Sequence, residues 1–459
     1  MQRSYLGALI GAAMIPVFLS FTANAAVGSE QIERLGKDLT CVGAETQGNS
    51  AGTIPEFTGR YLGAVPGWNP EPNSGEHPKD PYAEESPLFV ITGQNYDLFA
   101  DKLSEGQRAM FEQYPSTFRM NIYQGHRDFR YPDFVCERAK YNAERARVTY
   151  RGLGYMGMGH TPFPFPETAL ELLWNHMVPF RAYTDESVRD IASVNASGDV
   201  GFGRAEGQCL ALSNKPEGRP LTSDGVSAMC RTEVLLPIRE KGNVSINHEP
   251  YNYSRDKRVV WSYNAGTRRV RLAPGYGFDQ PLGGSNGNMT IDEDRLFNGS
   301  PERYEWTIVG KREMYIPANA YKPNTDQVSY EALLTPRHAN PDFMRYELRR
   351  VWVLEGTLKP EFNHLYGKRR LFLDEDTWHA VVADNYDRRG QLWKHAFANY
   401  YYHPDSSAWQ IGSSFYHDLT SGEYLAYNLT NERRQGPVIN RGNLKAYEFT
   451  PDRLRAQGR

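Results

Sequence analysis

Hydrophobic residues recur at helical spacing in the first part of the chain. Between Gln94 and Pro115, apolar side chains at 98, 99, 103, 110 and 111 predict one amphipathic helix. Residues 132–146, "PDFVCERAKYNAERA", predict a second helix that begins at its proline. A third helix is expected from Glu167 to Met177. Its apolar face carries Leu170, Leu173, Trp174 and Met177.

From about residue 251 the hydrophobic period changes to two, which is typical of strands. The stretches "KRVVWSYN" and "AGTRRVRL" predict a hairpin with its turn at 264–266. One face of the predicted strand 345–356 carries Tyr346, Leu348, Arg350, Trp352 and Leu354. Further strands are expected at 302–309, 312–317, 368–373, 379–386, 391–402 and 409–417. Many strands with short turns predict a large antiparallel sheet in a mainly β (α+β) fold.

The N-terminus has the order of a secretory signal peptide. A basic residue precedes an apolar run from Leu6 to Phe21, and small residues follow at Ala23 and Ala25. We expect cleavage near Ala25, a signal peptide over 1–25 and an extended segment over 26–90. Residues 91–459 are expected to form a single large domain. Its lid helices would span about 94–180 and its antiparallel sheet about 190–459.

The charge balance narrows the range of partners. The 459 residues include 52 Lys and Arg against 55 Asp and Glu, a formal net charge of −3. A general nucleic-acid binder usually has a basic excess, so no nucleic-acid partner is expected. No later stretch approaches the roughly 18 apolar residues of a membrane-spanning helix, so no stable membrane insertion is expected.

Four cysteines indicate two disulfides in an exported chain, and three pairings are possible. Cys209 and Cys230 flank a polar loop, so we predict that they pair, which leaves Cys41 for Cys136. A metal site is the alternative, but the spacings match no Cys-x-x-Cys pattern. The histidines also lack a zinc-binding spacing, so neither a metal nor a cofactor is expected.

Three consecutive acids, Asp374, Glu375 and Asp376, lie between two predicted strands. Aspartates are common in turns because their side chains cap backbone amides, which favours a structural connection. The alternative is a catalytic group formed by Asp374, Asp376, Asp384 and His379. A solvent-reachable cluster in a cleft would support catalysis, and an exposed hairpin tip would weaken it.

Basic residues cluster in the same region, at Arg349, Arg350 and 368–370. We expect them to form cross-strand ion pairs with acids such as Glu355 and Asp374. Binding of an anionic head group is the alternative.

Several stretches resemble the domain of unknown function 1329 family of Gram-negative bacteria. They are "LTCVGAETQGNSAGTIPEFTG", "FPFPETALELLWNH", "DEDRLFNGSPERYEWTIVGKREMYIP", "YELRRVWVLEGTLK" and "KRRLFLDEDTWHAVVADNYDRRGQLWK". Cys41 stands where the family usually has proline, a departure that supports a disulfide with Cys136.

The family is similar to the LolA/LolB lipoprotein-carrier superfamily, and this resemblance implies a fold and a role. The fold would be a curved antiparallel half-barrel with helices across its concave face. The space between would be apolar and would accept acyl chains. The implied role is periplasmic transport beside an inner-membrane transporter of the resistance-nodulation-division (RND) type and an outer-membrane protein.

We therefore expect a periplasmic carrier of a lipid or other hydrophobic molecule, without enzymatic activity. Burial of each methylene of such a cargo contributes about 0.8 kcal/mol. The expected cavity lining is Leu170, Leu173, Trp174, Met177, Tyr346, Leu348, Trp352 and Leu354. For each of these residues the alternative is ordinary core packing. A charge introduced at Trp352 or Trp174 is expected to abolish cargo binding without unfolding the protein.

Two other functions stay open. One is an enzyme that modifies an envelope lipid or glycan, and the other is an adaptor that bridges membrane partners. A large empty apolar cavity would favour the carrier, and a filled interior would favour the adaptor.

Overall fold

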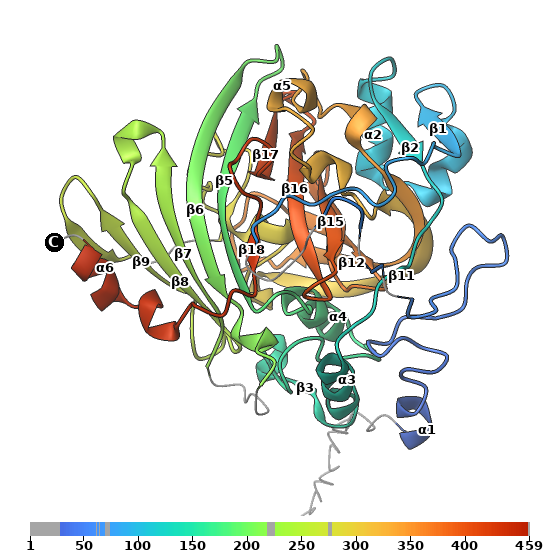
Figure 1. The fold of residues 1–459 in the computed structure, drawn as a ribbon, viewed down its shortest axis with the longest axis horizontal. Coiled ribbons are helices and arrows are strands. Elements are labelled where there is room, and N and C mark those ends of the chain that lie inside the picture. The colour runs from blue at the N-terminus through green and yellow to red at the C-terminus, as the bar shows by residue number, and fades with distance from the viewer. Residues whose placement is uncertain are drawn as a thin grey trace, which may run out of the picture.

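A sixteen-stranded sheet forms the centre of the protein (Figure 1). The computed structural model describes residues 28–60, 62–63, 65–68, 74–217, 225–273 and 278–457. The predicted signal peptide lies outside the described residues. The order along the sheet is β1-β2-β12-β13-β14-β15-β16-β17-β5-β6-β7-β8-β9-β10, with β11 paired to β12 and β18 to β5.

The strands of the main sheet pair almost entirely antiparallel. Among the described residues, the strand pairing that runs parallel is the one that joins Ile122 of β2 to Tyr346 of β12. The strands are β1 (Phe89–Thr92), β2 (Arg119–Ile122), β5 (Thr184–Val194), β6 (Val200–Leu210), β7 (Val226–Leu236), β8 (Val244–Pro250), β9 (Val259–Asn264), β10 (Arg269–Leu272), β11 (Tyr304–Pro317), β12 (Tyr346–Leu358), β13 (Lys368–Asp374), β14 (Ala380–Tyr386), β15 (Leu392–His403), β16 (Ala408–Asp418), β17 (Tyr424–Leu429) and β18 (Val438–Ile439). A separate pair is formed by β3 (Arg147–Thr149) and β4 (Gly154–Met156).

The helices are short. The α-helices are α1 (Ser29–Ile32), α2 (Glu105–Gln113), α3 (Asp133–Arg145), α4 (Ala169–Met177), α5 (Tyr330–Leu333) and α6 (Pro451–Gln457). The 3₁₀ turns are η1 (Tyr96–Lys102), η2 (Tyr150–Gly152), η3 (Leu212–Asn214), η4 (Ile238–Glu240), η5 (Ile291–Leu296), η6 (Pro301–Arg303), η7 (Lys322–Asn324), η8 (Pro341–Phe343) and η9 (Ala446–Phe449).

The predicted mainly β architecture is confirmed, with differences in its strands. The hairpin β9–β10 forms as expected. The two strands predicted over 302–317 are one strand, β11, interrupted by a bulge between Ile308 and Gly310. Strands also occupy 184–250, before the point at which the alternating pattern becomes clear, and β1 and β2 join the sheet from the N-terminal side.

The single helix predicted over 94–115 is wrong, because the chain forms η1 and then α2. Ser104 separates them by capping α2. Its hydroxyl accepts from the Gln107 amide at 3.1 Å, and its own amide donates to the Gln107 side chain at 2.8 Å. This reciprocal arrangement fixes a new helix start regardless of apolar spacing. The predicted α3 is confirmed, and α4 begins two residues later than expected.

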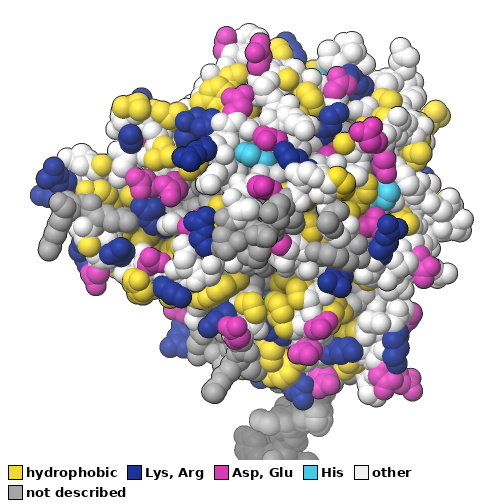
Figure 2. Space-filling view, in the orientation of Figure 1, with side chains coloured by type: hydrophobic (Ala, Val, Ile, Leu, Met, Phe, Trp, Pro, Cys, Tyr) yellow, Lys and Arg dark blue, Asp and Glu magenta, His cyan; other side chains and the backbone are white. Residues whose placement is uncertain are grey.

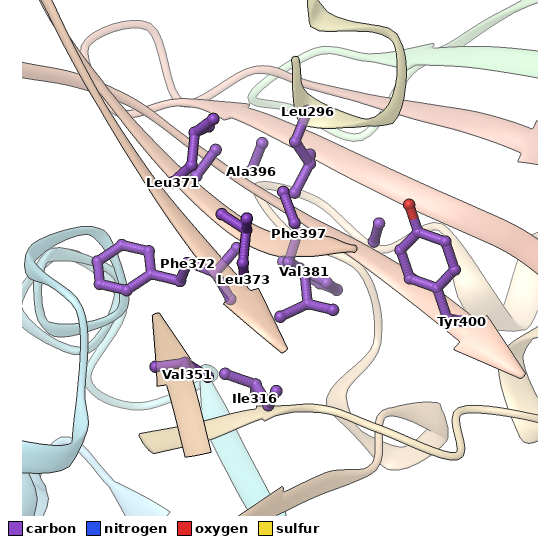
Figure 3. Packing of buried hydrophobic residues seen from close by; sticks show 14 of the residues in the cluster. Leu296, Ile316, Val351, Leu371, Phe372, Leu373, Val381, Ala396, Phe397 and Tyr400 are labelled. Atoms are coloured by element: carbon purple, nitrogen blue, oxygen red, sulfur yellow. The ribbon is translucent and has the colours of Figure 1, made fainter. Parts of the chain in front are cut away.

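One large hydrophobic cluster fills the space between the sheet and its covering segments. Figure 3 shows Leu296 of η5 above Ala396 and Phe397 of the sheet. All eight predicted cavity residues belong to this cluster. Six of them are buried, and Leu170 and Trp352 are partly buried against it. Most of the predicted lining is therefore packed against protein in this structure.

The N-terminal segment contributes to that packing. After α1 it is largely irregular, yet Val42 and Trp68 are buried. The Trp68 ring meets that of Tyr321 edge-on at 6.3 Å. A disulfide joins Cys41 to Cys136 of α3, which fixes the segment to the domain.

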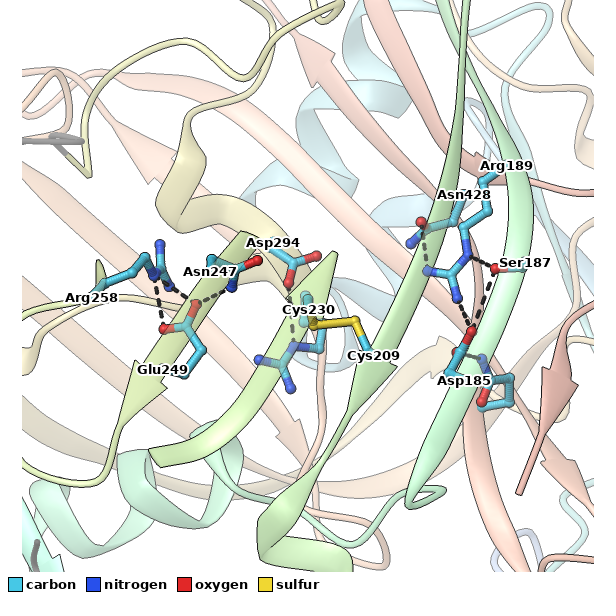
Figure 4. Close-up of a disulfide and its surroundings, with 12 residues drawn as sticks. Asp185, Ser187, Arg189, Cys209, Cys230, Asn247, Glu249, Arg258, Asp294 and Asn428 are labelled. Atoms are coloured by element: carbon cyan, nitrogen blue, oxygen red, sulfur yellow. Dashed lines mark hydrogen bonds and ion pairs between the residues drawn. A yellow bond between two sulfur atoms is a disulfide. The ribbon is translucent and has the colours of Figure 1, made fainter. Parts of the chain in front are cut away.

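Both predicted disulfides are present. Cys41 and Cys136 are separated by 95 residues, and Cys209 and Cys230 by 21. The second bond crosses from β6 to β7, where the two cysteines are direct partners in the sheet (Figure 4). The alternative of a cysteine metal site is thereby ruled out for this structure.

Candidate functional site

A small cavity lies between α4, the adjoining ends of β7 and β8, and η5. Its volume is about 20 Å³, enough for about one water molecule and far below the space of an acyl chain. It is lined by Trp174, Met177, Val178, Arg181, Ser213, Ser227, Ala228, Glu249, Pro250, Tyr253, Arg295 and Asn298. The cavity thus combines apolar walls with charged groups at the position expected for a lid over a sheet.

Hydrogen bonds fix α4 over this cavity. The hydroxyl of Thr168 and the carboxylate of Glu171 form a capping box that begins the helix. The indole of Trp174 donates to the carbonyl of Gly152 at 3.0 Å. His176 accepts from the Ala380 amide at Nδ1, 3.0 Å away, so its Nε2 donates to the Phe297 carbonyl at 2.9 Å. These contacts tie the helix to both η5 and the sheet.

Two of the eight predicted lining residues, Trp174 and Met177, border the cavity. The other six pack elsewhere in the hydrophobic cluster. Trp174 is only 1% exposed, so a charge introduced there would destabilise the fold as well as alter the cavity. Trp352 is partly buried with its ring 5.7 Å from the Lys311 ammonium, away from the cavity lining.

The charged groups in the lining are not equivalent. The carboxylate of Glu249 is neutralised by Arg258, whose Nε lies 2.7 Å away, and it accepts from Asn247 at 2.9 Å (Figure 4). Arg181 has no such partner: its guanidinium forms no hydrogen bond or ion pair with any other described residue. Burial, together with the charge of Arg295, lowers the pKa of Arg181 to about 9.

Arg295 is also incompletely satisfied. Its Nε and Nη1 are buried without a hydrogen-bond partner among the described residues. Its nearest carboxylate, that of Asp294, lies 3.5 Å from Nε and is 41% exposed. Buried guanidinium nitrogens without hydrogen bonds lower the stability of the folded protein. A ligand that accepted hydrogen bonds from Nε and Nη1 of Arg295 would remove this loss.

Two further orphan groups lie near these arginines. The Tyr400 hydroxyl and His379 Nδ1 are buried without partners in the described part of the chain, and their rings lie 4.4 Å apart. The pKa of His379 is held well below its usual value by burial and by the nearby positive charges of Arg295 and Arg181. His379 is therefore neutral, and one of its nitrogens can still donate a hydrogen bond.

Arg181 and Arg295 are not predicted as site residues from the sequence. Arg181 follows α4 in "HMVPFRAY", where nothing periodic marks it. Arg295 lies in "DEDRLFNGS", part of a stretch that indicates the family resemblance but no role for this arginine. In both stretches the local signal is an arginine next to apolar residues. This signal indicates a binding site only when the structure shows that the arginine is shielded from solvent.

A second, larger cleft lies at the β5–β6 turn. Its volume is about 230 Å³, and its lining is Ser193, Val194, Asn195, Asp199, Val200, Gly201, Asn286, Asn288 and Glu423. The lining is mostly polar, which does not match the predicted hydrophobic site.

The acidic connection is neither an exposed hairpin tip nor an open cleft. Asp374, Glu375 and Asp376 form the turn between β13 and β14, as the structural interpretation predicted, but all three are buried. Arg127 binds Asp376 through two hydrogen bonds of 2.9 and 2.6 Å, and Arg349 adds a third at 3.0 Å. The connection is a buried ion-pair network.

The N-terminal segment covers this network. Arg127 donates to the carbonyls of Glu45, Thr46 and Pro55 at 2.7, 3.1 and 3.2 Å. The Trp378 indole also donates to the Val42 carbonyl at 3.0 Å. These long-range contacts explain why a turn of charged residues is shielded from solvent.

The pKa values of the two aspartates shift in opposite directions, although burial disfavours the ionisation of both. It raises the pKa of Asp374 to about 7, against the opposing charge of Arg349. Burial also disfavours ionisation of Asp376, but the charge and hydrogen bonds of Arg127 outweigh it, so the Asp376 pKa is lowered. Asp376 is thus the ionised partner of the arginines.

The proposed catalytic group is divided between two places. His379 faces Tyr400, whereas Asp384 lies farther along β14 and accepts from the Gly106 amide of α2 at 2.9 Å. Asp384 also bonds His395 at 2.8 Å. A side chain at Gly106 would place its Cβ only 2.1 Å from the Asp384 carboxylate, so glycine permits this close docking.

The predicted cross-strand ion pairs are partly present. Arg370 binds Glu355 at 2.6 Å, as expected. Arg349 pairs with Glu347 and Asp376. Asp374 has no ion pair of its own with a described residue.

Charged side chains of both signs are interspersed on the face shown in Figure 2. Within the described ranges, no three His, Cys, Asp or Glu side chains are placed to hold a metal ion. No helix of the described chain has both the length and the apolar character needed to cross a bilayer.

Comparison with known proteins places the chain in a family. Residues 90–455 match the family described as "Protein of unknown function (DUF1329)". The chain belongs to this family. The predicted resemblance to the domain of unknown function 1329 family is therefore confirmed. A relative from Pseudomonas aeruginosa, "Uncharacterized protein PA3922", is 37% identical over 445 residues, 96% of each chain.

Two solved structures show more distant similarity. A DUF1329 family protein from Desulfovibrio piger is 14% identical with a TM-score of 0.40, over 60% of this chain and 92% of the other. The LolA superfamily protein NE2245 from Nitrosomonas europaea is 14% identical with a TM-score of 0.37, over 63% and 100% of the two chains.

Proposed function

We propose that this DUF1329 protein binds and carries a hydrophobic molecule between α4 and the sheet. The observation that carries the proposal is the cavity under α4, where apolar walls meet buried polar groups that lack protein partners. A site with apolar walls and a few convergent polar groups is typical of ligand binding. Trp174 and Met177 were expected to line such a site, and both border the cavity.

Loading would require α4 to move, because the cavity holds about one water molecule. The bonds from Trp174 to Gly152 and from His176 to Phe297 and Ala380 would break when the helix lifts. Burial of an acyl chain would compensate for their loss, at about 0.8 kcal/mol for each methylene. In this mechanism the structure, whose interior is filled by its own side chains, is the closed state without cargo.

The proposal also includes the compartment in which the protein acts and the proteins with which it works. We infer that the protein acts in the periplasm, and its two disulfides support an oxidising compartment. An RND-type inner-membrane transporter and an outer-membrane protein are the partners we propose, on the strength of the family resemblance. Crosslinking in intact cells tests this part, and recovery of neither partner would contradict it.

Binding of a neutral apolar dye tests the proposed site. We would titrate N-phenyl-1-naphthylamine into the purified protein and into Ala228→Met, which enlarges a buried cavity residue. We expect saturable fluorescence with the wild type and weaker binding with the variant. Ala332→Met, at an exposed position of α5, is the matched control and should bind like the wild type. No saturable binding, or equal binding by Ala228→Met with an intact fold, would contradict the site.

A non-catalytic adaptor is the second candidate, because the sheet interior is largely filled. An adaptor needs no mobile helix and would bind no dye. The same titration therefore separates the two functions.

A further inference from the structure

The cavity under α4 contains more positive charge than its own carboxylates neutralise. Glu249 is already bound by Arg258 and Asn247. Asp294 is partly exposed, and its carboxylate lies 3.5 Å from Nε of Arg295, which makes a long ion pair. Arg181 is left without a carboxylate partner among the described residues.

A cation that is shielded from water is normally paired, because removing its charge from water costs free energy. Arg181 is half-buried, lines the cavity and has no carboxylate partner among the described residues. A charge of the opposite sign on a ligand would supply that partner.

The unpaired donors are of types that suit such a ligand, and Arg295 lines the cavity itself. Arg295 offers Nε and Nη1, and Tyr400 offers a hydroxyl. In Figure 3 the Tyr400 hydroxyl points toward the side of the sheet on which Leu296 of η5 lies. Neutral His379 lies against Tyr400 and supplies one more possible donor. Planar guanidinium groups match the oxygens of a carboxylate or phosphate.

We propose that the cargo is an anionic amphiphile whose carboxylate or phosphate binds Arg181 and Arg295, while its apolar part lies along Trp174 and Met177. This inference rests on the proposed carrier function and specifies the chemical class of its cargo. The head group would fix the orientation of the molecule, and the apolar part would provide most of the buried area.

Paired probes with the same chain test the inference. Tetradecanoate and tetradecan-1-ol differ only in the charged group, and each would be titrated as a competitor of bound N-phenyl-1-naphthylamine. We expect tetradecanoate to bind roughly 10- to 100-fold more tightly, the range for hydrogen bonds to charged groups. Acetate, which has the carboxylate without the chain, should not displace the dye at comparable concentrations.

Variants locate the selectivity. Arg181→Gln and Arg295→Gln should each lose most of the preference for tetradecanoate and still bind the alcohol. Arg239→Gln removes a charge at a side chain that is 83% exposed and should keep the wild-type preference. Circular dichroism checks that each variant is folded. If the variants do not fold, the comparison of tetradecanoate with tetradecan-1-ol on the wild-type protein still tests the inference.

The outcomes separate this inference from the proposed function. Equal binding of both probes by the wild type, or unchanged selectivity in both arginine variants, would overturn the anionic cargo while leaving the carrier. Displacement by acetate as effective as by tetradecanoate would indicate a small-anion site and would also overturn it. Binding of neither probe nor dye would overturn the carrier and this inference together.

Discussion

Two buried charged regions of the protein differ in how completely their groups are paired. At the β13–β14 turn, Asp376 receives three hydrogen bonds from Arg127 and Arg349. Beneath α4, the Arg181 guanidinium forms no hydrogen bond or ion pair with a described residue, and Arg295 keeps two buried nitrogens without partners. Complete pairing is what a structural network requires, whereas missing partners indicate a place for a ligand. The contrast indicates that a structural network differs from a binding site in whether its charged side chains are paired, more than in how much charge it contains.

The largest expected effect comes from breaking the paired region. Asp376→Ala leaves Arg127 and Arg349 buried without their carboxylate, and we expect a loss of about 3–5 kcal/mol in unfolding free energy. Urea denaturation measures it. Asp38→Ala, which breaks an exposed pair with Arg34, is the control and should cost less than about 1 kcal/mol. Equal losses in the two variants would contradict a structural role for the Asp376 network.

The second prediction concerns pH. Burial raises the pKa of Asp374 from 3.8 to about 7, so the folded protein holds a proton that the unfolded chain releases above pH 4. The contribution of this group to stability is therefore full below about pH 4 and is lost as the pH rises to about 7. Asp374→Asn mimics the protonated form and should stabilise the protein by about 1–3 kcal/mol at pH 8, with little change at pH 4.

Denaturation of this variant at several pH values measures the difference. Asp101→Asn serves as the control, because that side chain is 76% exposed. A destabilised Asp374→Asn protein at pH 8 would show that the ionised carboxylate is needed, contrary to the expectation.

The third prediction has the opposite sign to the first. Arg181→Met removes a half-buried charge that has no ion-pair partner among the described residues, so we expect the unfolding free energy to rise by about 1 kcal/mol while anionic ligands are lost. Denaturation with and without tetradecanoate measures both effects. Arg239→Met is the exposed control. A loss of stability like that of Asp376→Ala would place Arg181 in a structural network instead.

The smallest expected effect concerns the pair Arg370–Glu355 on the sheet surface. Both side chains are about one-fifth exposed and lie 2.6 Å apart. Glu355→Gln should cost about 0.5–1 kcal/mol, and a double-mutant cycle with Arg370→Gln isolates the pair. A coupling of several kcal/mol would mean that partial exposure does not weaken ion pairs in this sheet.

Much of the fold is predictable from the sequence, because its signals are local. Alternation along 345–356 predicts β12, and the apolar spacing of α4 predicts a helix that covers the core. The split between η1 and α2 is missed, because the Ser104–Gln107 capping box overrides apolar spacing.

The candidate site is less predictable, because its decisive features depend on distant contacts. Trp174 and Met177 stand out as apolar residues on one helical face. Arg181 and Arg295 gain their meaning only when α4, β7, β8 and η5 meet around them. The acids at 374–376 likewise resemble an exposed turn until the N-terminal segment covers them.

Mass spectrometry of the protein, purified gently from its own cells, tests most directly whether it carries an anionic amphiphile. Native spectra would give the mass of the complex, and an organic extract would identify the bound molecule. We expect one anionic amphiphile per chain, and a depleted signal for Arg181→Met purified in the same way. A protein that carries no hydrophobic molecule in either measurement would contradict this expectation and favour the adaptor.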